Sequence, residues 1–215
     1  MTLRSVLLPV VLACGVLAAP PAFAAINSPQ LGAAYDAGHT NVSFKVYSSR
    51  ATRIELWAYS TATGTQMKLL RVLVKGTGNV WSTTVPVTSF TNAGITGTIY
   101  YGYRAWGPNW TYNSSWTRGS SLGFVTDVDA NGNRFNPNKL LTDPYALELS
   151  HDPTTATMTD GTVYASGALY RNIDDGSVAP KGIVLNGDTQ SIGTKPTRAF
   201  KDDVVYEVQL RGLTR

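Results

Sequence analysis

One short segment has carboxylate and amide side chains at a spacing that could hold a cation. The range Asp127–Gly132 reads DVDANG, which places an oxygen-bearing side chain at every second position before a glycine. This is the spacing of the first half of an EF-hand calcium loop. The second half departs from that pattern, because position twelve is Asn138 where the loop needs a bidentate glutamate. A tight turn held by Asx side chains therefore explains the segment better than a calcium loop.

Two more aspartates stand directly before prolines. Asp143 precedes Pro144, and Asp152 precedes Pro153. The residue before a proline is pushed toward extended backbone, so each carboxylate projects from a turn or an extended segment. Each could bind a hard cation or accept hydrogen bonds from nearby backbone N–H groups. Calcium takes about 6–8 oxygen ligands, and few are near in the sequence, so spacing alone favours capping.

A polar loop contains four large aromatic residues that could bind a sugar. They are Trp106, Trp110, Tyr112 and Trp116, with the amide side chains of Asn109 and Asn113 among them. Flat rings beside hydrogen-bonding groups are typical of carbohydrate sites, because rings stack on sugar faces while the polar groups fix orientation. Aromatic residues also cover one domain against another, and this interface packing is their commoner use.

No set of side chains in the sequence matches a catalytic constellation. The two histidines, His39 and His151, are far apart, and no G-x-S-x-G nucleophile motif is present. Spacing alone assigns no pair of carboxylates to the acid and nucleophile roles of glycoside hydrolysis. The formal net charge is +4 and the basic residues are scattered singly. This charge pattern argues against a nucleic-acid partner.

The elements that must position these side chains are β-strands. From residue 41 to residue 106, apolar and polar residues alternate with the two-residue period of half-buried strands. The predicted strands are Asn41–Ser48, Arg53–Ser60, Met67–Val74, Val80–Val87 and Thr98–Trp106. Five strands at this spacing indicate an all-β fold, specifically an immunoglobulin-like antiparallel β-sandwich, with long loops after it.

The first 24 residues are predicted to be a signal peptide. An apolar stretch from Val6 to Ala19 is followed by a small-x-small cleavage pattern that ends at Ala24. We therefore expect a secreted or periplasmic protein, with no membrane contact after cleavage. A lipoprotein cleavage box that would leave a lipidated Cys14 is the alternative. Since Cys14 is the only cysteine, cleavage after Ala24 excludes a disulfide within the mature chain.

The last fifteen residues, 201–215, are predicted to begin a second domain. Val204–Leu210 is a nearly continuous apolar run, which is typical of a strand buried on both faces of a parallel sheet. Such a strand needs neighbours, and the sequence supplies none after it, so we expect a truncated domain. The alternative is a strand that pairs with earlier strands of the sandwich. The predicted organisation is a signal peptide at 1–24, a β-sandwich at 25–125, a loop-rich connection at 126–200 and the start of a barrel at 201–215.

Three segments resemble a known family. They are YYGYRAWGPNW at Tyr100–Trp110, DVDANGNRFNPNKLLTDPYA at Asp127–Ala146 and KPTRAFKDDVVYEVQLRGLT at Lys195–Thr214. All three resemble the N-terminal region of bacterial secreted isoamylases, the glycogen and starch debranching enzymes of glycoside hydrolase family 13. The resemblance implies a sandwich of the carbohydrate-binding module 48 type, followed by a (β/α)8 barrel that hydrolyses α-1,6-glucosidic branch points.

The resemblance also implies what this chain lacks and what it contacts. The family's catalytic nucleophile, acid/base and third carboxylate lie on later barrel strands, so we expect the chain itself to be inactive. Asp152 aligns with a calcium ligand of the secreted isoamylases, and calcium binding should be weak or absent without the barrel. The expected partners of this monomer are α-glucan and the missing barrel. Gln209, Leu210 and Leu213 depart from the usual family residues. A stand-alone α-glucan-binding module and a purely structural domain are the alternatives.

Overall fold

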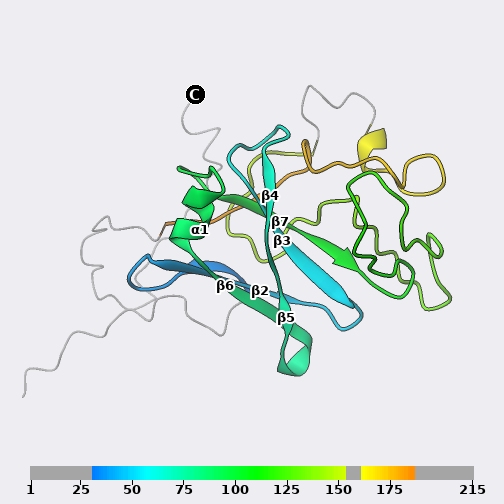
Figure 1. Ribbon diagram of the computed structural model, residues 1–215, viewed down its shortest axis with the longest axis horizontal. Coiled ribbons are helices and arrows are strands. Elements are labelled where there is room, and N and C mark those ends of the chain that lie inside the picture. Colours follow the sequence, from blue (N-terminus) through cyan, green and yellow to red (C-terminus); the bar gives the residue numbers. More distant parts are fainter. Residues whose placement is uncertain (1–30, 154–160, 187–215) are drawn as a thin grey trace, which may run out of the picture.

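The computed structural model describes residues 31–153 and 161–186, and these form two antiparallel four-stranded sheets (Figure 1). The first sheet has the order β1-β2-β6-β5, with bounds Gly32–Tyr35, Asn41–Tyr47, Val80–Pro86 and Val74–Lys75. The second has the order β4-β3-β7-β8, with bounds Met67–Val72, Arg53–Tyr59, Tyr100–Trp106 and Gly182–Ile183. The helices of the described residues are α1 (Val87–Asn92) and the 3-10 turns η1 (Thr77–Asn79) and η2 (Thr162–Tyr164).

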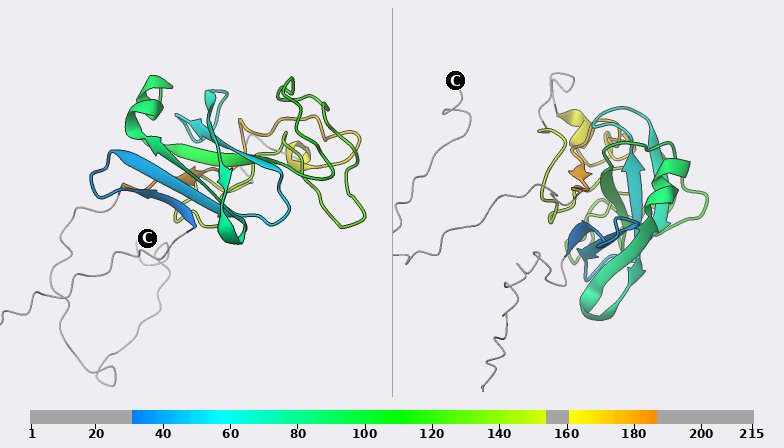
Figure 2. Two further views of the ribbon diagram at one scale, coloured as in Figure 1. Left: turned by 60° about the horizontal axis from the view of Figure 1, so that its bottom comes forward. Right: turned by 90° about the vertical axis from the view of Figure 1, so that its left-hand side faces the viewer.

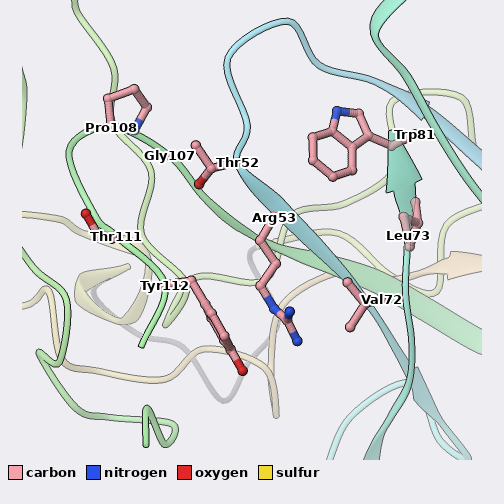
Figure 3. A pocket seen from close by; sticks show the side chains of 9 residues that line it. All are labelled: Thr52, Arg53, Val72, Leu73, Trp81, Gly107, Pro108, Thr111 and Tyr112. Atoms are coloured by element: carbon pink, nitrogen blue, oxygen red, sulfur yellow. The ribbon is translucent and has the colours of Figure 1, made fainter. Parts of the chain in front are cut away.

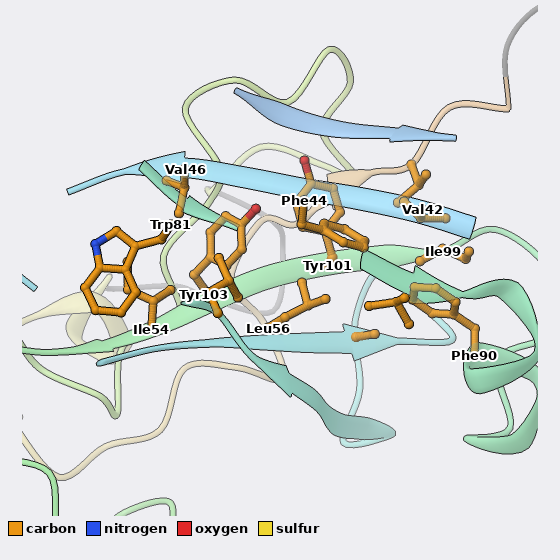
Figure 4. Close-up of a cluster of buried hydrophobic side chains, with 14 of the residues drawn as sticks. Val42, Phe44, Val46, Ile54, Leu56, Trp81, Phe90, Ile99, Tyr101 and Tyr103 are labelled. Atoms are coloured by element: carbon orange, nitrogen blue, oxygen red, sulfur yellow. The ribbon is translucent and has the colours of Figure 1, made fainter. Parts of the chain in front are cut away.

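The two sheets enclose one apolar core, as the alternating sequence predicts. Every second residue of β2, from Val42 to Val46, is buried, whereas β3 and β7 are buried at nearly every position. Figure 4 shows side chains from both sheets meeting in this core; the rings of Phe44 and Tyr101 make an edge contact with centroids 5.0 Å apart. Burying such aromatic side chains is the main source of stability for a domain without disulfides. The prediction of a β-sandwich is confirmed.

The prediction of a single strand at Met67–Val74 is wrong, because the structure divides this segment between the two sheets. β4 pairs with β3 in the second sheet, whereas β5 pairs with β6 in the first. Leu73 lies between them, is only 3% exposed, and donates its backbone N–H to the carbonyl of Ile54. Leu73 enters the core at the point where the chain crosses from one sheet to the other. This is why no polar residue marks the break between β4 and β5 in the sequence.

The second sheet is covered on its outer face by the loops that follow β7. Leu140 and Ala179 from these loops form a buried cluster with Tyr59 and Met67. Gly102 of β7 leaves room for Leu140, since a Cβ on Gly102 would lie 2.8–2.9 Å from the Leu140 side chain. β3 and β7 are consequently buried on both faces (Figure 2).

The region from 126 to 200, predicted as a loop-rich connection, contributes a strand to the second sheet. In this strand, β8, Ile183 pairs with Tyr100 of β7. The sequence predicted neither β8 nor β1, because two- and four-residue strands are too short to show a clear period. The predicted barrel strand at Val204–Leu210 and the predicted signal peptide lie outside the described residues.

Candidate functional site

A fully buried arginine fastens the loops to the second sheet. Arg104 of β7 has 0% exposure and donates hydrogen bonds to the carbonyl of Pro137 (2.7 Å) and to Asp174 Oδ1 (2.6 Å). Its guanidinium also lies 4.9 Å from the centre of the Trp57 ring. Because a buried cation is stable only when it is paired and hydrogen-bonded, this one residue ties two distant loop segments to β7.

A buried carboxylate fixes the turn that contains the first Asp-Pro pair. Asp143 is 2% exposed and accepts hydrogen bonds from the hydroxyls of Tyr101 (2.8 Å) and Tyr103 (3.3 Å). It also accepts the backbone N–H of Tyr145, which is the capping interaction predicted from the sequence and is confirmed. Burial raises the pKa of Asp143 above its usual value, although these hydrogen bonds oppose the shift.

Two further buried charges lie under the same loops. Asp175 accepts the backbone N–H of Leu140 at 2.6 Å, and burial raises its pKa to about 6. Lys181 donates to the carbonyls of Ala62 (2.7 Å) and Ala179 (2.9 Å), and burial lowers its pKa to about 8. In both cases, loss of water around the charged form is the dominant cause. Sequence reasoning did not identify these residues, because isolated charges in a polar segment show no pattern.

The DVDANG segment is an Asx turn, as predicted. Asp129 Oδ1 accepts the backbone N–H groups of Asn131 and Asn133, each at 2.9 Å, and Oδ2 accepts the Asn133 side chain. These hydrogen bonds hold the pKa of Asp129 below its usual value. The first aspartate, Asp127, is instead paired with Arg171, whose two nitrogens lie 3.1 and 2.6 Å from its oxygens. Both carboxylates of the segment are thus satisfied within the protein.

Two of the four predicted sugar-binding aromatics are buried. Trp106 is 0% exposed and Trp110 is 1% exposed, so neither presents a ring face on which a sugar could stack. Trp110 donates its Nε1 proton to the carbonyl of Leu122 at 2.9 Å and packs edge-on against Phe124. These two residues pack within the chain itself, so their burial does not test the alternative of an interface with a second domain.

The other two aromatics surround Trp106. Trp116 is half-buried, with its ring centroid 5.1 Å from that of Trp106, and the Tyr112 centroid lies 5.4 Å from it. Both contacts are edge-on, which is a favourable arrangement for aromatic pairs. Tyr112 is 38% exposed. The predicted group therefore divides into a buried centre and an exposed margin at Tyr112.

A pocket of about 390 Å³ opens beside Tyr112 (Figure 3). Its wall includes Arg53 at the start of β3, whose guanidinium carbon lies 3.8 Å from the centre of the Tyr112 ring. Arg53 is held in place by Glu55, 2.8 Å away, and Glu55 is only 3% exposed. The remaining lining residues are Thr52, Val72, Leu73, Trp81, Gly107, Pro108 and Thr111. A ring, two hydroxyls and a fixed guanidinium in one hollow are suited to a neutral, hydroxyl-rich ligand.

Asp152 lies at the surface, beside an anchored histidine. His151 is fixed through both ring nitrogens, which contact Ser150 Oγ and the carbonyl of Val178, each at 2.8 Å. Asp152 itself is exposed. Within residues 31–153 and 161–186, no group of three or more His, Cys, Asp or Glu side chains could hold a metal ion. The assignment of Asp152 as a calcium ligand therefore remains a prediction.

Comparison with known proteins agrees with the β-sandwich. The sequence profile of carbohydrate-binding module 48, the isoamylase N-terminal domain, matches residues 30–146. The match covers more than half of the chain. This chain belongs to the carbohydrate-binding module 48 family.

The curated relatives of this chain include isoamylases and glycogen debranching enzymes. The chain is 59% identical to the isoamylase of Pseudomonas amyloderamosa over 97% of its own length, and 58% identical to a Flavobacterium isoamylase over 95%. It spans about a quarter of their lengths, 27% and 26% respectively, at the N-terminal end. A glycogen debranching enzyme of Erwinia tasmaniensis is 32% identical over 86% of this chain and 23% of that protein.

Solved structures similar to this chain include a streptococcal pullulanase and a pneumococcal glycogen-degrading virulence factor. The Group B Streptococcus pullulanase SAP in complex with maltotetraose is 18% identical, with a TM-score of 0.40, over 74% of this chain and 15% of that one. The catalytic module of the pneumococcal protein SpuA, in complex with an inhibitor, is 19% identical with a TM-score of 0.42, over 74% and 17%.

Proposed function

We propose that this chain is the N-terminal module of an isoamylase-type debranching enzyme that hydrolyses α-1,6-glucosidic branch points in glycogen and amylopectin. The observation that carries the proposal is 59% identity across 97% of the chain to an isoamylase of which it spans only 27%. Glycoside hydrolysis needs a pair of positioned carboxylates. In the described residues, the buried carboxylates Asp143 and Asp175 accept hydrogen bonds from the chain itself and so have a structural role. The module therefore supports a reaction that takes place elsewhere in the enzyme.

Grafting tests this function. A chimera that joins the chain to the part of Pseudomonas amyloderamosa isoamylase beyond the aligned region should release linear glucans from amylopectin. The 215-residue chain alone should release none. Reducing ends, measured for the chimera, the chain and the parent isoamylase under the same conditions, give the comparison. An inactive chimera beside an active parent, or an active isolated chain, would contradict the proposal.

Glucan contact at the Tyr112 pocket is the more specific part of the proposed function. The pocket offers the hydroxyls of Thr52 and Thr111 and the Tyr112 ring, which is 38% exposed and has the Arg53 guanidinium over one face, while Glu55 already neutralises Arg53. Such a lining favours a neutral sugar over an anion. The competing role is a module that only packs on its catalytic partner, and the burial of Trp106 and Trp110 inside this chain supports neither role.

Replacing Tyr112 with alanine should weaken glycogen binding about five- to tenfold, because an aromatic contact contributes about 1 kcal/mol beyond its buried area. Affinity electrophoresis in gels containing glycogen measures the effect. Tyr47→Ala is the matched control, since Tyr47 is also exposed (51%) but lies on β2. Equal losses in both variants would place the glucan elsewhere, and absence of binding by the unmodified chain would favour the packing role.

Calcium is proposed to bind through Asp152 only when a second domain adds ligands. One exposed carboxylate supplies a small part of the about 6–8 oxygens that calcium takes. Calcium should therefore raise the melting temperature of the chimera by mass action and leave the isolated chain unchanged. Thermal unfolding with calcium and with chelator, for Asp152→Ala and for Glu148→Ala as the exposed carboxylate control, tests the assignment. A calcium-dependent shift that survives Asp152→Ala would refute it.

We propose export with cleavage after Ala24, on the strength of the apolar stretch and cleavage pattern in the sequence. In the part of the chain that the structure describes, no helix has the length and apolarity to cross a membrane. N-terminal sequencing of the exported protein distinguishes cleavage at Ala24 from a mature chain that begins at a lipidated Cys14.

A further inference from the structure

A second hollow, of about 530 Å³, is lined by residues from the loop after β2 and from the segment after the Asx turn. It is named here the Arg134 pocket, and it shares no lining residue with the pocket beside Tyr112. Arg50, Arg134 and Lys139 line it, whereas none of the described residues in its wall is an aspartate or a glutamate. Because like charges in one hollow repel each other, this lining is suited to an anion.

The Asx turn holds Arg50 at this pocket. Arg50 Nη1 donates hydrogen bonds to the carbonyl of Asn131 (2.6 Å) and to Asn133 Oδ1 (3.3 Å), and Asn133 is only 6% exposed. The Arg50 charge also lowers the pKa of Asp129, but the oxygens of that carboxylate already accept hydrogen bonds from Asn131 and Asn133. A guanidinium has five N–H donors, and no described residue accepts a hydrogen bond from Nε or Nη2 of Arg50. These donors are therefore available to a ligand.

Lys139 contributes charge to the pocket but no free donor. Its Nζ donates to three backbone carbonyls, at 2.6, 3.2 and 2.8 Å, which uses all the protons of an ammonium group. Burial lowers the pKa of Lys139, and the charges of Asp175 and Asp174, which do not line the pocket, oppose this shift. An anion in the pocket would favour the charged form of Lys139 further.

Arg134 is exposed and forms no hydrogen bond or ion pair with any described residue. Its whole guanidinium is therefore free to bind a ligand. Arginine is suited to phosphate in particular, because its planar fork of donors matches two phosphate oxygens at once.

Two free hydroxyl groups complete the lining. Ser49 and Ser166 are both exposed, and no described residue forms a hydrogen bond with either side chain. Hydroxyls of this kind can pair with the hydroxyls of a sugar, which a bare anion does not have. The volume of the pocket is within the range of about 300–1,000 Å³ that is usual for small-molecule sites.

We propose that the Arg134 pocket binds a sugar phosphate. The phosphate monoester would lie between Arg134 and the free donors of Arg50, while the sugar hydroxyls pair with Ser49 and Ser166. The pocket beside Tyr112 differs in ligand class, because Glu55 neutralises its one arginine. This proposal does not depend on the debranching function.

Isothermal titration calorimetry of the 215-residue chain tests the ligand class. Glucose 6-phosphate is the probe, and inorganic phosphate and glucose each supply one half of it. Glucose 6-phosphate should bind about tenfold more tightly than inorganic phosphate, because two additional hydrogen bonds together contribute about that much. Glucose should give no measurable heat. Binding of glucose as tight as that of glucose 6-phosphate would overturn the anion site, and equal affinities for the two phosphates would overturn recognition of the sugar.

Arg134→Gln tests the place of binding. This variant should weaken glucose 6-phosphate binding about tenfold, since a charge-assisted hydrogen bond to phosphate is lost. Its thermal unfolding should be unchanged, because Arg134 has no partner among the described residues. Lys68→Gln is the matched control: it removes the same charge from an exposed position, but on β4 and outside the lining. Equal losses in the two variants, or no binding of glucose 6-phosphate by the unmodified chain, would overturn the proposal.

Discussion

Replacing Arg104 with alanine should lower the free energy of unfolding by about 3–5 kcal/mol, the range for breaking a buried ion pair by removing one partner. The variant leaves the Pro137 carbonyl without its donor and Asp174 without its nearest cation. It also opens a cavity beneath the loops that cover the second sheet. Urea unfolding of the full chain, followed by tryptophan fluorescence, measures the loss.

Arg118 provides the matched control for Arg104. Its guanidinium also contacts Asp174, at 3.4 Å, but its side chain is 40% exposed. A solvent-screened pair of this kind contributes about 0–1 kcal/mol to stability. The free energy of unfolding of Arg118→Ala should therefore be close to that of the unmodified chain. If both variants lost a similar free energy of unfolding, burial of Arg104 would not explain its contribution to stability.

Replacing Gly123 with alanine should destabilise the chain by about 3 kcal/mol or more, because two effects combine at this position. The backbone φ of Gly123 is +82°, which disfavours any side chain. An added Cβ would also lie 1.8 Å from the Thr111 carbonyl oxygen, which is backbone and cannot rotate away. Since Thr111 donates its N–H to the carbonyl of Gly123, the substitution should also displace Tyr112 and weaken glucan binding at the pocket.

Gly132→Ala separates backbone strain from the steric contact. Gly132 has a similar φ of +77°, but nothing lies within 4 Å of the place that an added Cβ would occupy. The free energy of unfolding of this variant should fall by only about 1 kcal/mol, which is the cost of a side chain in a left-handed backbone conformation. If Gly132→Ala is as destabilising as Gly123→Ala, the contact with the Thr111 carbonyl does not explain the effect. Thermal unfolding of both variants provides the comparison.

The sequence predicted the strands that the core depends on, because apolar and polar residues alternate along them with the two-residue period of a strand, although β3 and β7 are buried on both faces. β2, β3, β6 and β7 lie within the predicted ranges and differ only by one or two residues at their ends. The period could not reveal that Met67–Val74 divides between two sheets. A residue that turns into the core at a crossing, as Leu73 does, looks the same in sequence as one more residue of a strand.

For the candidate site, the sequence identified the aromatic group but not the role of each member. Residue type alone does not separate Trp106, which is buried, from Tyr112, which lines the pocket. Arg53 stands some sixty residues earlier in the sequence and reaches Tyr112 only because β3 and β7 pair along their whole lengths. No local signal could have placed these two side chains together.

The sandwich, the Asx turn at Asp129 and the cap at Asp143 could all be predicted from the sequence, and its motifs pointed to the isoamylase family. Each of these structural features rests on short-range chemistry: alternation, side-chain oxygens near backbone donors, and proline geometry. Tertiary packing was needed to bury Arg104 and Lys181, to enclose Trp106, and to bring Arg50 and Arg134 to one pocket. The physical reason is that burial depends on which distant segments cover a residue, and only the folded chain brings those segments together.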